Sequence, residues 1–165
     1  MRKIFLLCGK VGSGKSTLAK LLEEHFNAVP FSMDDFMLGL YGEVPDRDEF
    51  TEKVEKCKKI IYQISDHILK FTNVSFELGC WKREEREATK KRFPDYKVII
   101  IYLKVDKETL IERLKHRNNN LKENEYLIDE KTFNIFETMF EEPDDNENVI
   151  IYKNDKQLIN EINKI

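Results

Sequence analysis

The residues with the most specific chemistry form a glycine-rich run near the N-terminus, between an apolar segment and an amphipathic one. The run matches the pattern G-x-x-x-x-G-K-[ST] at every specified position, and a threonine follows it. Its residues are Gly9, Lys10, Val11, Gly12, Ser13, Gly14, Lys15, Ser16 and Thr17. Glycines let successive backbone N–H groups face one point, and the start of the following helix adds positive charge. Phosphate is the expected ligand, and the alternative is a glycine-rich turn that only caps a helix.

Two side chains of this run have separate expected roles toward a nucleoside triphosphate. Lys15 is expected to contact the β and γ phosphates as a point charge, and the Ser16 hydroxyl to bind a Mg²⁺ ion that bridges them. The pattern therefore predicts binding of a nucleoside triphosphate with Mg²⁺. It does not indicate what happens to the γ-phosphoryl group, which residues after other strands must decide.

Two adjacent carboxylates, Asp34 and Asp35, follow the second strand-like run of the sequence. Transfer of a phosphoryl group to an alcohol needs a carboxylate that orients the hydroxyl and accepts its proton. Asp34 is the candidate for this base. The alternative is that Asp34 or Asp35 caps the following helix, and both roles can hold, one for each carboxylate. Asp35 and Tyr41 are candidates for contact with the acceptor.

The third strand-like run ends on a carboxylate, Glu77, in the manner of a Walker B sequence. Such a carboxylate can bind Mg²⁺ through water or orient a substrate. Trp81, the single tryptophan of the chain, follows shortly after Gly79 and can form the wall of a ligand pocket. The alternative for Trp81 is packing in the core or against a lid.

The segment from Lys82 to Arg92 reads KREEREATKKR and carries six basic and three acidic residues. One interpretation is a solvated helix face with pairs of Glu and Lys side chains. A second is that Arg83 or Arg86, near the start of the helix, holds an anionic substrate.

Arg113 and Arg117 stand four residues apart near the end of a predicted helix, and hence on the same face. A cation there can neutralise the migrating phosphoryl group, which is the role of an arginine finger supplied by the same chain. We assign this role to Arg117 and nucleotide binding to Arg113. The alternative is favourable basic charge at the C-terminal end of a helix.

Strand-like and helix-like segments alternate along the chain, which predicts an α/β fold with a mainly parallel sheet and helices on both faces. The carboxyl ends of parallel strands form the ligand crevice of such folds. Expected strands cover 3–8, 28–32, 73–77, 97–104 and 148–152. Expected helices cover 15–26, 35–41, 47–70, 82–91, 107–117, 129–140 and 155–164, while 118–120 and 141–147 are expected to be exposed, mobile connections.

Length and composition fit one ordinary domain. The chain has 165 residues, of which 41% are hydrophobic and 36% charged, with a formal net charge of −3. This charge gives no global positive field for nucleic acid, so a nucleic-acid partner is improbable. Three cysteines without C-x-x-C spacing point to a reducing cytoplasm, and the N-terminal apolar run is too short for a signal or membrane segment.

Nearly the whole chain resembles a family of small P-loop kinases, which includes polynucleotide 5′-hydroxyl kinases, chloramphenicol phosphotransferase, zeta toxins and uncharacterised "AAA family ATPase" chains. The resemblance runs through GKVGSGKST at 9–17, SMDDFMLGLYG at 32–42, SFELGCWKREER at 75–86, IERLKHRN at 111–118 and FETMFEEPDDNE at 136–147. It implies a three-layer fold with a sheet of order 2-3-1-4-5, a short helical lid at about 113–130, and ATP as the nucleotide. It also implies Asp34 as general base, Arg117 as lid arginine and Glu77 as the strand-end carboxylate, where related chains more often have Asp.

Residues and resemblance together predict a single domain that transfers the γ-phosphoryl group of ATP to a hydroxyl of a small molecule such as a nucleoside, sugar or antibiotic. The paired downstream lid arginine of a polynucleotide kinase is missing, because Asn119, Asn120 and Leu121 follow Arg117. No obligatory protein partner and no membrane contact are expected. The alternatives are a nucleotide-dependent binding module with slow hydrolysis, and a kinase acting on a polynucleotide or, like a toxin, on a nucleotide sugar.

Overall fold

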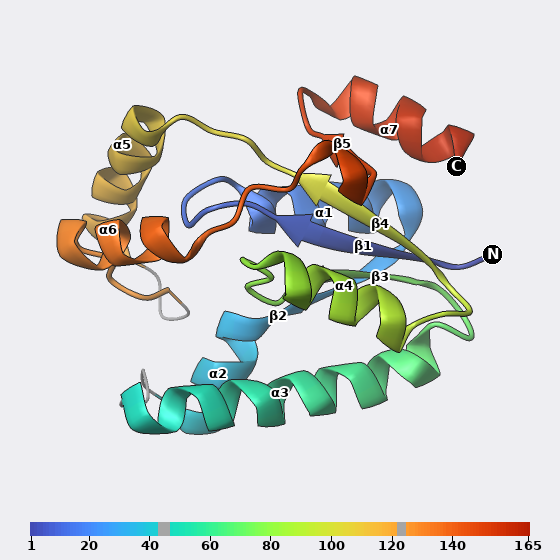
Figure 1. Ribbon diagram of the computed structural model, residues 1–165, viewed down its shortest axis with the longest axis horizontal. Helices are drawn as coiled ribbons and strands as arrows, with labels where there is room; N and C mark the ends of the chain where they lie inside the picture. The colour runs from blue at the N-terminus through green and yellow to red at the C-terminus, as the bar shows by residue number, and fades with distance from the viewer. Residues whose placement is uncertain (43–46, 122–124) are drawn as a thin grey trace.

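A parallel β-sheet lies at the centre of the molecule (Figure 1). In the computed structural model, which describes residues 1–42, 47–121 and 125–165, this sheet has five strands in the order β2-β3-β1-β4-β5. Every neighbouring pair runs parallel. The strands are β1 (Lys3–Cys8), β2 (Ala28–Ser32), β3 (Asn73–Glu77), β4 (Lys97–Tyr102) and β5 (Val149–Ile151). The predicted α/β class is confirmed, and so is the strand order that the resemblance implies.

Helices cover both faces of this sheet (Figure 1). One face packs against α1 and α7, and the other against α2, α3 and α4, while α5 and α6 stand beyond the carboxyl ends of the strands. The helices are α1 (Lys15–Phe26), α2 (Met33–Tyr41), α3 (Arg47–Ile68), α4 (Arg83–Arg92), α5 (Lys107–Asn118), α6 (Glu130–Met139) and α7 (Asp155–Lys164), with a 3₁₀ turn η1 (Asp145–Glu147) before β5.

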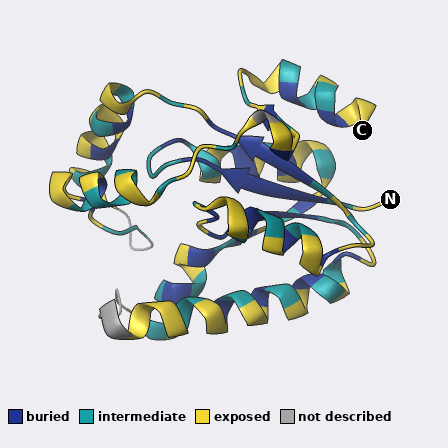
Figure 2. Ribbon diagram, in the orientation of Figure 1, coloured by how far each residue is buried: buried dark blue, intermediate teal, exposed yellow. Residues whose placement is uncertain are grey.

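The central strand β1 is buried on both sides, as Figure 2 shows. Alternate side chains of a strand point to opposite faces, so Ile4 and Leu6 join the cluster with α3, whereas Phe5 and Leu7 join the cluster with α1 and α7. This burial on two faces explains the unbroken apolar run of β1, which is typical of a parallel sheet covered by helices.

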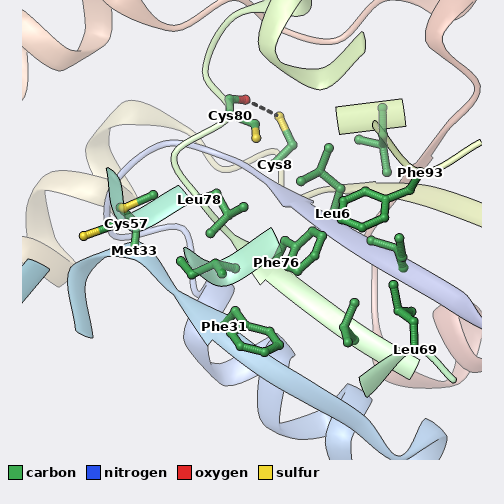
Figure 3. Close-up of a cluster of buried hydrophobic side chains, with 14 of the residues drawn as sticks. Leu6, Cys8, Phe31, Met33, Cys57, Leu69, Phe76, Leu78, Cys80 and Phe93 are labelled. Atoms are coloured by element: carbon green, nitrogen blue, oxygen red, sulfur yellow. Dashed lines mark hydrogen bonds between the residues drawn. The ribbon is translucent and has the colours of Figure 1, made fainter. Parts of the chain in front are cut away.

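Cys8, at the end of β1, is the buried strand residue that the sequence predicts. Its thiol donates a weak hydrogen bond to the carbonyl oxygen of Cys80 at 3.8 Å (Figure 3). Burial raises the pKa of Cys8 to about 12 and that of Cys80 to about 11, so both thiols are protonated at neutral pH. Cys57 is also a buried, free thiol.

Two strands are shorter than the sequence predicts. β4 stops at Tyr102 instead of Lys104, because its partner β1 turns into the glycine-rich loop after Cys8, and the N–H of Leu103 makes the last bond, to the Cys8 carbonyl at 2.9 Å. β5 begins at Val149 because Asn148 takes a left-handed backbone conformation with φ of +52°. The end of β4 and the start of β5 are therefore set by residues whose backbone turns away from the sheet.

Helices α5 and α6 share a small core with the glycine-rich loop. Leu110, Leu114, Ile128 and Phe133 form it, and Val11 packs against it from the loop. The lid expected over 113–130 therefore corresponds to the later part of α5 and the connection to α6, of which residues 122–124 lie outside the described part. Across the described ranges, none of the helices combines the length and the apolar character needed to cross a membrane.

Candidate functional site

The glycine-rich loop joins β1 to α1 and bends through conformations that favour glycine. Gly12 and Gly14 have φ of +80° and +100°. A side chain at position 9 would collide with its surroundings, since an added Cβ at Gly9 would lie 2.7 Å from Ser13 Oγ. Gly14 is the N-cap of α1, and none of the described side chains accepts a hydrogen bond from this helix start. The first amides of α1 thus fit an anionic ligand.

Lys15 lies across this loop. Its ammonium donates to the carbonyl oxygens of Gly9 and Lys10, both at 3.1 Å, and stands 3.8 Å from Glu77 Oε1. The side chain therefore holds its charge between the loop and the end of β3, next to the amides that would bind phosphate. This is the placement that the sequence pattern predicts for a phosphate-binding lysine.

Ser16 and Glu77 come together from α1 and β3. The Ser16 hydroxyl donates to Glu77 Oε2 at 2.9 Å. Hydroxyl and carboxylate oxygens suit Mg²⁺, which takes few protein ligands and completes its octahedron with phosphate oxygens and water. The described residues contain no group of three or more His, Cys, Asp or Glu that would hold a metal by themselves. This donor pair therefore fits a metal shared with a nucleotide, and the longer Glu77 side chain reaches Ser16 without difficulty.

Asp34 lies in the first turn of α2, just after the register pair formed by Ser32 and Glu77 on β2 and β3. The N-cap of α2 is Ser32, whose hydroxyl accepts from the N–H of Asp35 at 3.3 Å, so neither aspartate is the cap. Burial removes water from around the Asp34 carboxyl and raises its pKa. The negative charges of Glu77 and Asp35 raise this pKa further. The positive charges of Lys15 and Arg117 lower it. Asp34 as a whole residue is nevertheless exposed to solvent, so an incoming acceptor can reach it.

The two candidate arginines, Arg113 and Arg117, lie on α5. Arg113 Nη1 donates to the carbonyls of Gly12 and Ser13 at 3.4 and 3.3 Å, which places it on the glycine-rich loop. Arg117 Nη2 donates to the carbonyl of Tyr126 at 3.3 Å, and its buried Nε finds no hydrogen-bond partner among the described residues. An unsatisfied guanidinium N–H is costly, so this geometry fits an additional anionic acceptor at Arg117.

Trp81 contacts a helix beyond the strand ends. Its ring lies 4.9 Å from that of Phe136 on α6, at an angle of 60°, which is the lid-packing alternative of the sequence analysis. The neighbouring Glu137 binds the ammonium of Lys10 at 2.5 Å and that of Lys107 at 3.5 Å. The junction between the loop, Trp81 and α6 leaves no room for a water molecule. Sequence spacing gave no signal for Glu137, because its partners lie far away along the chain.

The structure corrects the interpretation of Arg86 as a substrate ligand and also that of a wholly solvated helix face. Arg86 has no exposed surface, and its Nε and Nη2 bind the two carboxylate oxygens of Glu147 at 2.7 and 2.8 Å. Glu147 is 1% exposed, so the expected exposed connection at 141–147 is wrong at this residue. Lysine-rich and arginine-rich stretches usually lie in solvent, and only tertiary packing distinguishes this one member.

Two other candidate substrate residues lie apart from Lys15 and Asp34. Arg83 is exposed and its guanidinium binds Asp144 at 2.6 Å. Tyr41 is at the last turn of α2, about 10 Å along the helix from Asp34, where the Lys53 ammonium lies 4.8 Å from the centre of its ring. Neither arrangement brings these side chains to the phosphate loop.

The chain is similar to a known protein family and to several solved structures. A family model described as an AAA domain matches residues 4–143 of this chain. A sugar kinase from Janibacter sp. HTCC2649 superposes with a TM-score of 0.65 at 16% identity, over 99% of this chain and 93% of that chain. Kti12 from Chaetomium thermophilum, solved with ADP-AlF3, superposes with a TM-score of 0.73 at 12% identity, over 98% and 97% of the two chains.

A third solved structure, APS kinase from Mycobacterium tuberculosis with AMPPNP and APS, superposes with a TM-score of 0.65 at 13% identity, over 99% and 96% of the two chains. At these identities the likeness shows a shared fold. No curated protein sequence matches this chain.

Proposed function

We propose, from the premise that this chain belongs to the AAA domain family whose model it matches, that it is an ATP- and Mg²⁺-dependent phosphotransferase whose acceptor is a hydroxyl group of a small molecule. One observation carries the proposal. The Lys15 ammonium, the bonded pair of Ser16 and Glu77, and the Asp34 carboxyl gather at one edge of the sheet, and the positive charge of Arg117 lies near enough to lower the pKa of Asp34. A nucleotide switch would need Lys15, Ser16 and Glu77 but has no use for a base such as Asp34.

Each of these side chains has a separate role in phosphoryl transfer. Bound ATP and Mg²⁺ supply the γ-phosphoryl group and the metal charge that offsets its oxygens. Asp34 orients the acceptor hydroxyl and takes its proton as the oxygen bonds to phosphorus, and the bond to the departing ADP breaks. Lys15 and Arg117 hold the negative charge that moves toward the ADP oxygen. Ser16 and Glu77 would hold the Mg²⁺ ion when it is bound.

The acceptor is proposed to be small and not strongly anionic. The local excess of basic residues after β3 would have served an anionic substrate, but Arg86 and Arg83 are bound to Glu147 and Asp144. The net charge of −3 gives no field that would attract a polynucleotide. Nucleosides, sugars and hydroxylated antibiotics remain as candidate acceptors.

An acceptor-library screen with labelled ATP, read by mass spectrometry for the gain of one phosphate, tests the proposal. With an acceptor in hand, Asp34→Ala is expected to keep its affinity for ATP and to lose about 10²- to 10⁴-fold in turnover. Lys15→Ala provides the contrast, because it should lose nucleotide binding itself. Undiminished transfer by Asp34→Ala would remove Asp34 from the mechanism, and a screen without any product would argue against the kinase.

A second candidate function is a nucleotide-dependent binding module. The ion pair between Lys10 of the loop and Glu137 of α6 favours it, because a nucleotide that rearranges the loop would also act on α6. The neighbour Kti12, solved with ADP-AlF3, is not named as a kinase. A protein partner that binds only with ATP present, together with no phosphorylated acceptor, would favour this function over the first.

A further inference from the structure

The buried ion pair of Arg86 and Glu147 joins two segments that lie 61 residues apart in sequence. Arg86 belongs to α4, and Glu147 ends the η1 turn that leads into β5. Beyond its two bonds to Glu147, Arg86 uses Nη1 to donate to the carbonyls of Trp81 and Glu141 at 3.1 and 3.0 Å. The Arg86 guanidinium holds the pKa of Glu147 below its usual range, so the pair is charged at neutral pH. All three nitrogens of the guanidinium are engaged.

A continuous series of contacts leads from this pair to the phosphate loop. The Trp81 carbonyl also accepts from the N–H of Glu141 at 2.9 Å, so the backbone at Trp81 is fixed from two sides. Its ring then packs on Phe136 of α6. The next residue of α6, Glu137, binds Lys10, whose own carbonyl accepts from the Lys15 ammonium.

We propose that Arg86 and Glu147 are positioning residues for nucleotide binding, which they affect by holding Trp81 against α6 and, through Glu137 and Lys10, by fixing the shape of the phosphate loop. This inference rests on the proposed nucleotide site but not on phosphoryl transfer. Buried ion pairs add little stability over well-packed apolar residues, because both charges must be desolvated. A pair with this many directed bonds instead fixes one geometry, and here it fixes that of the Trp81 backbone.

The test measures nucleotide affinity by calorimetry, with a non-hydrolysable ATP analogue, Mg²⁺ and no acceptor, at a temperature where each variant is folded by circular dichroism. Glu147→Gln and Arg86→Lys are expected to weaken affinity about three- to thirtyfold. Glu142→Gln is the matched control. It makes the same substitution in the same segment but at an exposed carboxylate, whose partners are Lys104 and the Tyr102 hydroxyl and not Arg86, and it should bind like the wild type.

A double-mutant cycle separates positioning from general loss of stability. Trp81→Ala leaves the ion pair in place and should weaken affinity by a similar factor. The double variant Trp81→Ala, Glu147→Gln should be no weaker than the worse single variant, because both act through one contact. Independent losses that multiply would show that the pair does not act through Trp81.

A merely structural ion pair would lower the melting temperature of Glu147→Gln and Arg86→Lys and leave the affinity of the folded fraction unchanged, which would overturn the proposal. Should both variants fail to fold, Trp81→Ala decides: wild-type affinity in this variant would overturn the proposal, and weakened affinity would support it. The outcomes also separate this inference from the proposed function. A wild-type protein that binds no nucleotide overturns both, whereas binding without any phosphorylated acceptor removes only the kinase.

Discussion

At the scale of single residues, Arg86 and Arg83 show how the same side chain differs with its surroundings. Both stand on α4 and both bind a carboxylate, but Arg86 is fully buried and Arg83 is exposed. Arg86→Ala leaves the buried Glu147 charge without a partner and should lower the free energy of unfolding by about 3–5 kcal/mol. Arg83→Ala should cost less than about 1 kcal/mol, since solvent screens its pair. Urea titrations of both variants check this, and equal losses would contradict it.

The Asp34 carboxyl should titrate above the ordinary range of aspartate in the nucleotide-free protein. Desolvation disfavours the ionised form, and the charges of Glu77 and Asp35 disfavour it further. Because the pKa of Asp34 is raised in the folded protein, acidification protonates this carboxyl at a higher pH than it would an ordinary aspartate. Asp34 must be ionised to act as a base, so its activity as a base is lost as the pH falls through this raised pKa. Carboxyl-carbon NMR should show this raised midpoint, and Asp35→Asn should shift it downward. A midpoint at or below that of a free aspartate would refute the interpretation.

Residue roles were predictable from the sequence only where a local pattern encodes them. The loop that contains Lys15 and Ser16 carries its own spacing and its own glycine conformations, so the pattern was sufficient to predict where these two residues lie, while their roles stay predictions. The role of Arg86 was not predictable, because six basic residues in eleven positions look alike until packing buries one of them. The roles of Glu147, which pairs with Arg86, and of Glu137, which pairs with Lys10 of the loop, likewise depend on contacts between distant segments.

At the scale of elements, α7 shows how a short helix is held in place. It has ten residues, which is too few for an isolated helix to be stable, and it depends on Leu158 and Ile162, both fully buried. Leu158→Ala should lower the free energy of unfolding by about 2–5 kcal/mol. Asn154→Ala, which removes the side-chain bond to the N–H of Gln157, should cost about 1 kcal/mol. Denaturant unfolding gives both values, and a larger loss for Asn154→Ala would contradict this ranking.

The elements themselves were largely predictable because their periodicities differ. Buried parallel strands read as short apolar runs and the helices as amphipathic stripes, so all five strands and seven helices appear at the expected places in the described residues. The η1 turn at 145–147 was missed, since its capping residue Asp144 and buried Glu147 have the composition of an exposed loop. The start of α2 moved to Met33 because Ser32, and not an aspartate, caps it.

At the scale of the whole molecule, the fold brings Lys15, Glu77 and Asp34 to one edge because β1, β2 and β3 are parallel neighbours. The family resemblance predicted the strand order, and the strand order in turn predicted that these residues lie close together. The packing of α6 against Trp81 and the glycine-rich loop could not be predicted, because no local sequence pattern relates residues 10, 81 and 136. Long-range contacts of this kind depend on the packing of the complete molecule.

Nucleotide binding should stabilise the entire fold, because the unfolded chain has no loop in which to hold phosphates. A ligand at one hundred times its dissociation constant adds about 2.7 kcal/mol, which for a domain of this size raises the melting temperature by about 5–10 °C. Differential scanning fluorimetry with Mg²⁺ and a non-hydrolysable ATP analogue measures the shift. Lys15→Ala should show none, since its ammonium is the charge that the phosphates meet at this loop.

The metal dependence of that shift tests the pairing of Ser16 with Glu77. In the wild type, chelation of Mg²⁺ should reduce the stabilisation, because Ser16 and Glu77 would hold the ion and its charge would offset that of the phosphates. In Glu77→Gln the neutral amide attracts the ion less, so the shifts with and without Mg²⁺ should approach each other. Ser16→Ala should behave in the same way. If Glu77→Gln kept the full metal effect, Mg²⁺ would have to be held elsewhere, and Glu77 would then act only as the hydrogen-bond partner of Ser16.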